Sequence, residues 1–311
     1  MKSRTWTLGS ICSLLVVISA ATSTLYAAPI RVNCGGGGSI NNALTSLASA
    51  GNTRGITILV AGTCRENVVI TAFDHLTLEA SPIATIQDQS NGTEALIEIV
   101  NSYDVTVMGF TLNGGSAGVS CDADSNCTLY LNSIQRAAAI GVHFGNSNGQ
   151  ILNNNISNTA GKGIAIYSSS VSTVSNTISG NVKAGVEVGY KSDLTATSDT
   201  IQNNAIGIEV IEGSVLRAND LTINGNSSDG VDLESSSAAS FGQINTGSVI
   251  TGNGGNGVSN NDLSFASFSG TNNVSGNLTQ PDIACNPQYS ATRGASTVGG
   301  TTNCTEPQHS K

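Results

Sequence analysis

The sequence predicts an all-β solenoid of parallel coils, each about 22 residues long, on the strength of two periodic series. The first series places an aliphatic residue once in every repeat: Leu112, Ile134, Ile156, Ile178, Ile201 and Ile223. The second series places a β-branched residue after Gly, in phase with the first: Gly118-Val119, Gly141-Val142, Gly163-Ile164, Gly185-Val186, Gly207-Ile208 and Gly230-Val231. Such a period indicates repeats that lack a core of their own and bury their apolar residues against their neighbours.

The residues between these positions favour strands. Runs such as Ile164-Ala165-Ile166 and Ile208-Glu209-Val210 alternate apolar and other residues, are rich in β-branched side chains and are bounded by Gly, Asn and Ser. This pattern is typical of short strands and excludes helices. Leucine-rich repeats would need Leu at fixed intervals, which this chain lacks. Each repeat is therefore expected to be one coil with two or three strands.

Asparagine recurs two places before the first series, at Asn132, Asn154 and Asn176, with Asp199 in the next coil. Asn tolerates left-handed backbone, and stacked amides about 4.8 Å apart can hydrogen-bond to one another. We therefore predict an internal Asn ladder at a turn.

The ends of the chain have different compositions. Lys2 and Arg4 precede an apolar stretch from residue 11 to 20, which predicts a signal peptide over residues 1–27. This stretch is too short for a membrane anchor. Residues 28–55 should form a cap with a short amphipathic helix that begins after Ser39 and stops at Gly51. The parallel β-helix should span residues 56–279, and residues 280–311 should form an irregular, disulfide-tied tail. A secreted or periplasmic monomer is expected.

Charge and cysteine content narrow the context further. Without residues 1–27 the chain keeps ten basic and 21 acidic residues, a formal charge of −11. This argues against nucleic acid, which needs a basic footprint. Six cysteines remain, an even number that favours disulfides in an exported chain and leaves fifteen connectivities open. We favour pairing of neighbours: Cys34 with Cys64, Cys121 with Cys127, and Cys285 with Cys304.

The opening coil resembles a known group. Ala61-Gly62-Thr63-Cys64-Arg65-Glu66-Asn67-Val68, within residues 56–78, is similar to the first coil of right-handed parallel β-helix proteins of the pectin-lyase-like superfamily. The recurring Asn-x-Ile and Gly-Ile/Val patterns resemble the repeat of the same group, over roughly residues 39–278. The resemblance implies a single-stranded right-handed parallel β-helix and leaves function open, because the superfamily includes lyases, hydrolases, esterases, epimerases, tailspikes and adhesins.

The signatures of its enzymes are mostly missing. The sequence has no Asn-Thr-Asp, Asp-Asp and Gly-His-Gly set of polygalacturonases, no Asp-Phe pair of the kind that methylesterases need, and no Asp-Pro-His block of mannuronan epimerases. Pectate lyases use a basic residue beside calcium-binding carboxylates, and Lys183 and Arg217 are the candidates here. Whether the chain is an enzyme stays open at this point.

One constellation could carry chemistry. If the apolar residues of each run face the core, the residue between them faces outward, and this position is occupied in successive coils by His143, Ala165, Glu187, Glu209 and Asp232. Lys162 and Lys183, just before the Gly positions, could neutralise these acids or bind an anionic sugar. Three interpretations remain: a solvated face that keeps strands soluble, a contact for a glycan or for Ca²⁺, and a pair of catalytic carboxylates.

We favour the solvated face for the acids themselves. For the whole chain we predict an exported module that contacts an extracellular polysaccharide or cell-surface polymer. The alternative is a polysaccharide lyase or glycoside hydrolase with Glu187, Glu209, Asp232 or Lys183 as catalytic residues. Neither requires a cofactor other than Ca²⁺ at the acids. An adhesin or tailspike would usually need a trimerisation region or a membrane anchor, and the sequence shows neither.

Overall fold

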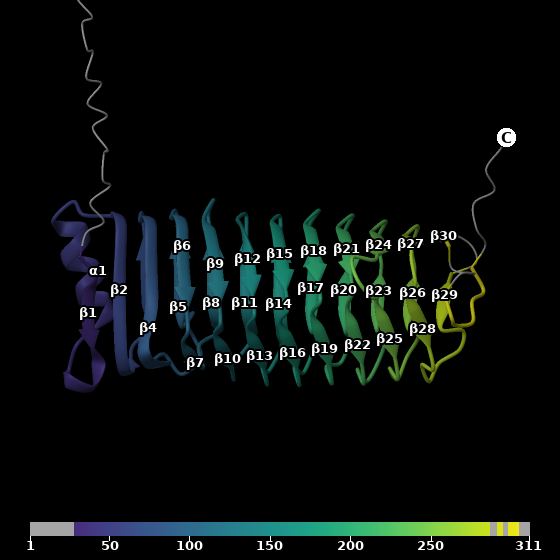
Figure 1. The fold of residues 1–311 in the computed structure, drawn as a ribbon, viewed down its shortest axis with the longest axis horizontal. Coiled ribbons are helices and arrows are strands. Elements are labelled where there is room, and N and C mark those ends of the chain that lie inside the picture. Colours follow the sequence, from purple (N-terminus) through teal and green to yellow (C-terminus); the bar gives the residue numbers. More distant parts are fainter. Residues whose placement is uncertain (1–27, 287–290, 295–297, 305–311) are drawn as a thin grey trace, which may run out of the picture.

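The computed structural model describes residues 28–286, 291–294 and 298–304, so the expected signal peptide lies outside the described residues. Within these described ranges, thirty strands and one α-helix stack into an elongated β-helix (Figure 1). All pairings between strands are parallel, and neighbouring strands in space come from successive coils about 22 residues apart. The predicted parallel β-helix is confirmed.

Each full coil contributes one strand to each of three walls. The first wall, a ten-stranded sheet, contains β3 (Val68–Thr71), β5 (Ile97–Val100), β8 (Ala117–Asp122), β11 (Ile140–Gly145), β14 (Lys162–Tyr167), β17 (Val186–Gly189), β20 (Ile208–Val210), β23 (Val231–Leu233), β26 (Val258–Asn260) and β29 (Ile283–Cys285). Its outward side is called the site face below.

The other two walls belong to one 20-stranded sheet, because the long strands β2 (Arg54–Arg65) and β4 (Asp74–Gln87) run through both. The second wall contains β6 (Tyr103–Met108), β9 (Asn126–Tyr130), β12 (Asn148–Leu152), β15 (Ser170–Val174), β18 (Asp193–Thr197), β21 (Val215–Asn219), β24 (Ala238–Gly242), β27 (Phe265–Phe268) and β30 (Ala291–Arg293). The third contains β7 (Thr111–Asn113), β10 (Ser133–Gln135), β13 (Asn155–Ser157), β16 (Thr177–Ser179), β19 (Thr200–Gln202), β22 (Thr222–Asn224), β25 (Val249–Thr251) and β28 (Asn273–Ser275).

The two periodic series form the core. Residues of the first series pair in register along the third wall, and those of the second series pair along the first wall. All are buried. The structure also explains the Gly of the second series: a Cβ at Gly163 would lie 2.5 Å from the carbonyl oxygen of Gly185 and 2.7 Å from Cγ2 of Ile178. Close packing between coils therefore requires glycine there.

The predicted Asn ladder is present and buried. The backbone N–H of Asn132 donates to Oδ1 of Asn154 at 2.9 Å, that of Asn154 to Asn176 at 2.8 Å, and that of Asn176 to Asp199 at 2.7 Å. The left-handed residue is the one before the ladder position, for example Asn153 with φ 55°. The expectation that the ladder residue itself adopts this backbone was wrong, because its side chain must point inward to reach the next coil.

A second ladder was not predicted. Its amides link successive coils just before the Gly positions and end on the carboxylate of Asp282: Asn181, Asn204, Asn226, Asn253 and Asn277. Their spacing of 22 to 27 residues is visible in the sequence and would have revealed the ladder.

The ends differ from the predicted boundaries. The helix α1 (Ile40–Ser49) begins after Ser39, whose side chain accepts a hydrogen bond from the N–H of Asn42 at 3.2 Å, as predicted. Before it, β1 (Ile30–Asn33) pairs with β2, and a 3-10 turn, η1, covers Cys34–Gly36. At the other end β29 and β30 continue the walls beyond residue 279, so the tail is not wholly irregular.

Three disulfides join the pairs that we favoured: Cys34–Cys64, Cys121–Cys127 and Cys285–Cys304. Disulfides of this kind persist in oxidising compartments and are rare in the cytosol, so the cross-links are consistent with an extracytoplasmic location. Within the described ranges, no helix is long and apolar enough to cross a bilayer.

Candidate functional site

The predicted column of His143, Ala165, Glu187, Glu209 and Asp232 is present on the site face. These residues pair in register on β11, β14, β17, β20 and β23. The register also extends the column in both directions, with Glu98 and Ser120 before His143 and with Ser259 after Asp232.

The acids of this column are not a solvated face. Glu187 is 5% exposed and Asp232 is 8% exposed, and Glu209 is only partly exposed. Burying a carboxylate is costly unless hydrogen bonds or charges compensate it. The expectation of a freely solvated acidic face was therefore wrong, because Lys162 and Tyr167 of the preceding coil cover Glu187.

Glu187 is held by a compact network. Nζ of Lys162 lies 2.5 Å from Oε2 of Glu187, and the hydroxyl of Tyr167 donates to Oε1 at 2.5 Å. Lys162 also donates to the Tyr167 hydroxyl at 2.7 Å. Burial alone would raise the pKa of Glu187, but the hydrogen bonds from Lys162 and Tyr167 lower it below its ordinary value. Glu187 is therefore an anion at neutral pH.

Glu209 has the opposite character. Burial, followed by its hydrogen bond to Glu187 and the charge of that anion, raises the pKa of Glu209 to about 7. Burial and the charges of Asp229 and Glu234 raise the pKa of Asp232 to about 6. Two carboxyl groups that share a hydrogen bond lie closer than the roughly 5 to 5.5 Å between the carboxylates of retaining glycosidases. Glu187 and Glu209 can exchange a proton, but they lie too close together to act as the two carboxylates of a retaining glycosidase.

A second polar cluster surrounds His143. Its Nδ1 lies 3.1 Å from the hydroxyl of Ser120 and 3.4 Å from Oδ1 of Asp122, and Ser120 donates to Oδ2 of Asp122 at 2.5 Å. Burial opposes ionisation of Asp122, but hydrogen bonds from His143 and Ser120 lower its pKa. The Ser120 hydroxyl donates to the Asp122 carboxylate and not to His143. The three residues are therefore not arranged as the nucleophile, general base and orienting carboxylate of a catalytic triad.

Aromatic side chains connect the two clusters. The rings of His143 and Tyr167 meet edge to face with centroids 5.6 Å apart, and those of Tyr167 and Tyr190 do so at 5.2 Å. Tyr190 is 57% exposed. Sequence reasoning missed Tyr167 and Tyr190, although Tyr167 lies two places after Ala165 and so faces outward on the same strand.

Two hollows of the site face lie over these residues. One, of about 480 Å³, is lined in part by Glu98, Ser120 and His143. The other, of about 380 Å³, is lined by Lys162, Val182, Lys183, Ala184, Glu187, Ala205, Ile206 and Glu209. Both fall in the size range of small-ligand sites. Ala165, a small residue, occupies the column between them.

The structure separates the two basic candidates for lyase chemistry. Lys183 is exposed and lines the hollow with Glu187 and Glu209, and it forms no ion pair within the described part of the chain. Arg217 lies on β21 in the second wall and pairs with Asp193, so it cannot take part in this site.

The acids fit Ca²⁺ poorly. Calcium requires several oxygens converging on one point. Glu187, Glu209 and Asp232 belong to three successive coils and do not bring ligand atoms within 4.8 Å of one another as a set. Lys162 already occupies the cationic position beside Glu187. The group that does converge in the described part of the chain, Cys34, Cys64 and Glu66, has its sulfurs in a disulfide.

Coil geometry, ladders and walls together define a right-handed parallel β-helix protein whose polar hollows lie on the first wall. The chain belongs to the family described as right handed beta helix region, whose profile matches residues 53–201 and 117–280. No curated protein is a significant sequence match to the chain.

Solved structures of the same fold include carbohydrate-active proteins. The A-module of mannuronan C-5 epimerase AlgE4 from Azotobacter vinelandii matches with a TM-score of 0.61 and 15% identity, over 86% of this chain and 93% of that one. Pectate lyase Pel9A matches with a TM-score of 0.54 and 13% identity, over 89% and 79%. Tailspike protein 2 from Escherichia coli O157:H7 bacteriophage CAB120 matches with a TM-score of 0.50 and 11% identity, over 83% and 46%. At these identities the likeness concerns the fold alone.

Proposed function

We propose that this protein is an exported, monomeric β-helix that binds a linear extracellular or cell-surface polysaccharide along its site face. One observation carries the proposal: the two hollows lie in line over successive coils, with only Ala165 between them in the column. From Glu98 to Asp232 the column covers seven coils, or about 29 Å at about 4.8 Å per coil. That length suits an extended polymer better than a single small ligand.

The side chains of the site suit sugar hydroxyls. The partly exposed carboxyl groups of Glu209 and Asp122 can accept hydrogen bonds, and Lys183 can donate them. Charge-assisted bonds of this kind are stronger than bonds between neutral groups. Tyr190 offers an exposed ring with an apolar face and a polar tip, which suits a partner with both kinds of surface. The basic and apolar residues at the start of the chain support export, as do the disulfides.

Affinity electrophoresis against soluble polysaccharides tests the proposal. The panel contains alginate, polygalacturonate, mixed-linkage β-glucan, galactomannan and dextran. We expect at least one polymer to retard the parent protein, and we expect Tyr190→Ala to weaken that binding about tenfold, a loss of about 1.4 kcal/mol. Tyr103→Ala is the matched control, because Tyr103 is 61% exposed but lies on β6 in the second wall. Equal losses in both variants, or retardation by no polymer, would contradict the proposal.

A second function, catalysis, is favoured by one specific observation: Glu209, with a pKa raised to about 7, lies beside the anion Glu187. A carboxyl group of this pKa can donate a proton near neutral pH. The corresponding activity is a polysaccharide lyase, because Glu187 and Glu209 are too close together for the two carboxylates of a glycoside hydrolase. It is detected as unsaturated-uronate absorbance, with and without Ca²⁺. Any such activity should decline above about pH 7 as Glu209 ionises, and Glu209→Gln should lower it at least about a hundredfold. Activity that Glu209→Gln leaves intact would exclude this role.

A further inference from the structure

The second wall carries another hollowed surface, which is separate from the site face. From β9 to β27, each strand of the second wall has a polar residue at the same outward position. These residues are Thr128, Gln150, Ser172, Thr195, Arg217, Ser240 and Ser267. All but Arg217 are uncharged. These seven residues, called the polar track below, pair in register and cover about 29 Å at about 4.8 Å per coil.

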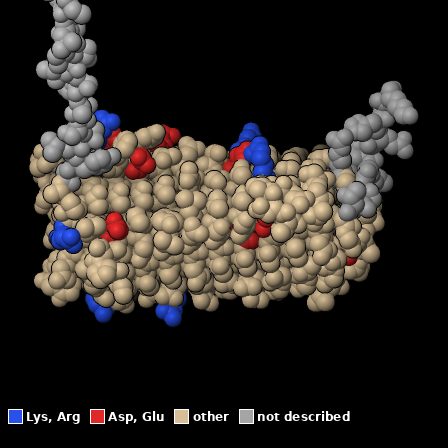
Figure 2. Space-filling view, viewed as in Figure 1, with Lys and Arg blue, Asp and Glu red and all other residues tan. Residues whose placement is uncertain are grey.

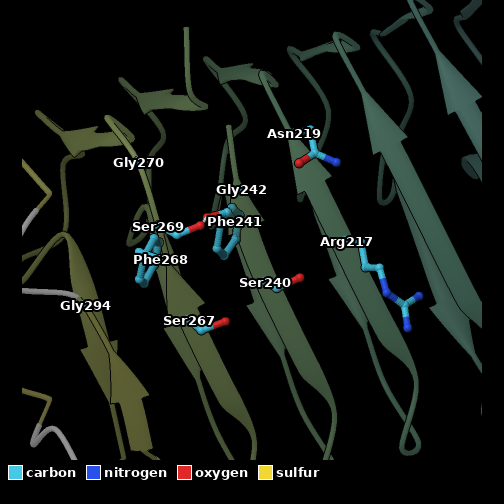
Figure 3. A pocket seen from close by; sticks show the side chains of 10 residues that line it. All are labelled: Arg217, Asn219, Ser240, Phe241, Gly242, Ser267, Phe268, Ser269, Gly270 and Gly294. Carbon is cyan, nitrogen blue, oxygen red and sulfur yellow. Dashed lines mark hydrogen bonds between the residues drawn. The ribbon is translucent and has the colours of Figure 1, made fainter. Parts of the chain in front are cut away.

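Both ends of the polar track are hollowed. Thr128, Gln150, Ser172 and Thr195 line a depression of about 280 Å³ together with residues of the same strands. Arg217, Ser240 and Ser267 line a larger one of about 870 Å³. Figure 3 shows these last three side chains on neighbouring strands, in one line across the coils. The two depressions therefore lie in line along the polar track, one toward each end, and are together called the groove below.

Small residues make the larger depression. Ser240, Gly242, Ser267 and Gly270 line it, whereas longer side chains would fill it. A Cβ at Gly242 would come within 2.5 Å of Oδ1 of Asn219, so a larger residue there would also displace the Asn219 side chain. Beneath the depression, Phe241 and Phe268 turn inward and stack with centroids 4.8 Å apart and an interplanar angle of 8° (Figure 3). The floor of the depression is thus made of packed aromatic rings.

The electrostatics of the groove indicate an uncharged ligand. Among the described residues that line either depression, Arg217 alone is charged, and it forms an ion pair with Asp193. No uncompensated cation is therefore present among the described lining residues to attract a polyanion, and the net charge of −9 for the whole chain opposes one. Few Lys, Arg, Asp or Glu side chains are visible on the face of the molecule in Figure 2.

The polar groups of the groove have spare hydrogen-bonding capacity. The side chains of Gln150, Ser172, Thr195 and Ser240 make no hydrogen bond to another described residue, although Ser172 and Thr195 are partly buried. Hydroxyl and amide groups can both donate and accept. Sugar hydroxyls, which also do both, match such a surface at successive coils.

We propose that the polar track is a second binding groove, specific for an unbranched, uncharged polysaccharide that runs parallel to the helix axis. This inference does not depend on the proposed function of the site face, because the two surfaces are on different walls and share no residue.

Ser240→Tyr tests the groove by filling the larger depression with a ring. The probes are mixed-linkage β-glucan, galactomannan and dextran, with alginate and polygalacturonate as anionic comparisons, in affinity electrophoresis at fixed salt. The Tyr190→Ala variant, in which binding at the site face is weakened, should bind at least one uncharged polymer in preference to both anionic ones, and adding Ser240→Tyr should weaken that binding about tenfold or more. Thr200→Tyr, at an outward position of β19 in the third wall, is the matched control and should bind as the parent does.

The background variant Tyr190→Ala separates the two grooves. In that background any remaining binding of the uncharged polymer should be lost on adding Ser240→Tyr. Melting temperatures within about 2 °C of the parent would show that the variants are folded. In the Tyr190→Ala background, the inference is overturned if no uncharged polymer binds, if anionic polymers bind better, or if adding Ser240→Tyr leaves the binding unchanged. None of these results would exclude binding on the site face, which Tyr190→Ala reports.

Discussion

Asp199 places a carboxyl group in a ladder otherwise built from amides. It is 1% exposed, and its Oδ1 accepts from the backbone N–H of Asn176 at 2.7 Å, as an amide oxygen would. Its Oδ2 accepts from the hydroxyl of Thr173 at 2.5 Å. In the preceding coil the amide nitrogen of Asn176 donates instead to the carbonyl of Ile151. Thr173 thus supplies the proton that an aspartate lacks.

Replacing this carboxyl group should change the dependence of stability on pH. Burial raises the pKa of Asp199 to about 6, so the folded protein holds this proton more tightly than the unfolded chain. The resulting stability is present below the ordinary pKa of 3.8 and is lost as pH rises through about 6. Asp199→Asn should remove that loss and raise Tm at pH 7.5, by about 2 to 4 °C for each kcal/mol gained. Melting curves at pH 4, 5, 6 and 7.5 measure the effect.

Asn154→Asp is the matched control for that variant. It places a carboxyl group at an equivalent ladder position where the corresponding residue, Leu129, has no hydroxyl to donate. It should lower Tm most at pH 7.5 and least at pH 4. A Tm for Asp199→Asn that stays below the parent at every pH would mean that the carboxylate is needed in its ionised form.

At the scale of the element, each coil is stabilised by inward apolar residues that stack on the equivalent residues of the neighbouring coils. Ile178 pairs with Ile156 on one side and with Ile201 on the other, and it is fully buried. Ile178→Ala should therefore lower the free energy of unfolding by about 2 to 5 kcal/mol, because it removes apolar contacts and leaves a cavity between coils. Denaturant unfolding followed by circular dichroism measures this loss.

Thr177→Ala provides the comparison within the same strand. Its side chain faces outward on β16, so its truncation should change stability by less than about 0.5 kcal/mol. Similar losses in the two variants would mean that the inward file does not carry the stability of the third wall.

At the scale of the whole molecule, the helix α1 covers the open end of the first wall. Its buried residues Ile40, Leu44 and Leu47 face the coil end, and Oδ1 of Asn41 accepts from the N–H of Val69 on the terminal strand β3 at 3.1 Å. Glu66 anchors the start of the helix by accepting from the N–H of Ile40 at 2.7 Å. An uncovered strand would expose unpaired backbone groups to other molecules.

Displacing this cap should cause self-association. Leu44→Lys buries a charge under α1 and should release the helix, so that light scattering shows concentration-dependent oligomers. Thr45→Lys, on the exposed side of the same helix, should elute as the parent does in size-exclusion chromatography. A monodisperse Leu44→Lys variant of unchanged hydrodynamic size would show that α1 is not needed to protect the coil end.

The sequence by itself determined the architecture. Residue spacing was enough to predict the length of the repeat, the strands and the stacked apolar residues of the core. It also predicted one ladder, the capping helix and the column that contains Glu187 and Glu209. They did so because a solenoid repeats the same local contacts in every coil, so that sequence distance and spatial distance are proportional. The second ladder was equally periodic and could have been found.

Only the tertiary structure decided the character of the site. Spacing placed Glu187 outward but could not show that Lys162 and Tyr167 of the preceding coil cover it, so a buried ion pair was taken for a solvated acid. Spacing also could not show that Lys183 lines the site face whereas Arg217 lies on the second wall. The wall to which a strand belongs depends on where the chain turns. Burial and pKa depend on side chains from several coils packing over one another, and a repeat pattern specifies their positions but not their contacts.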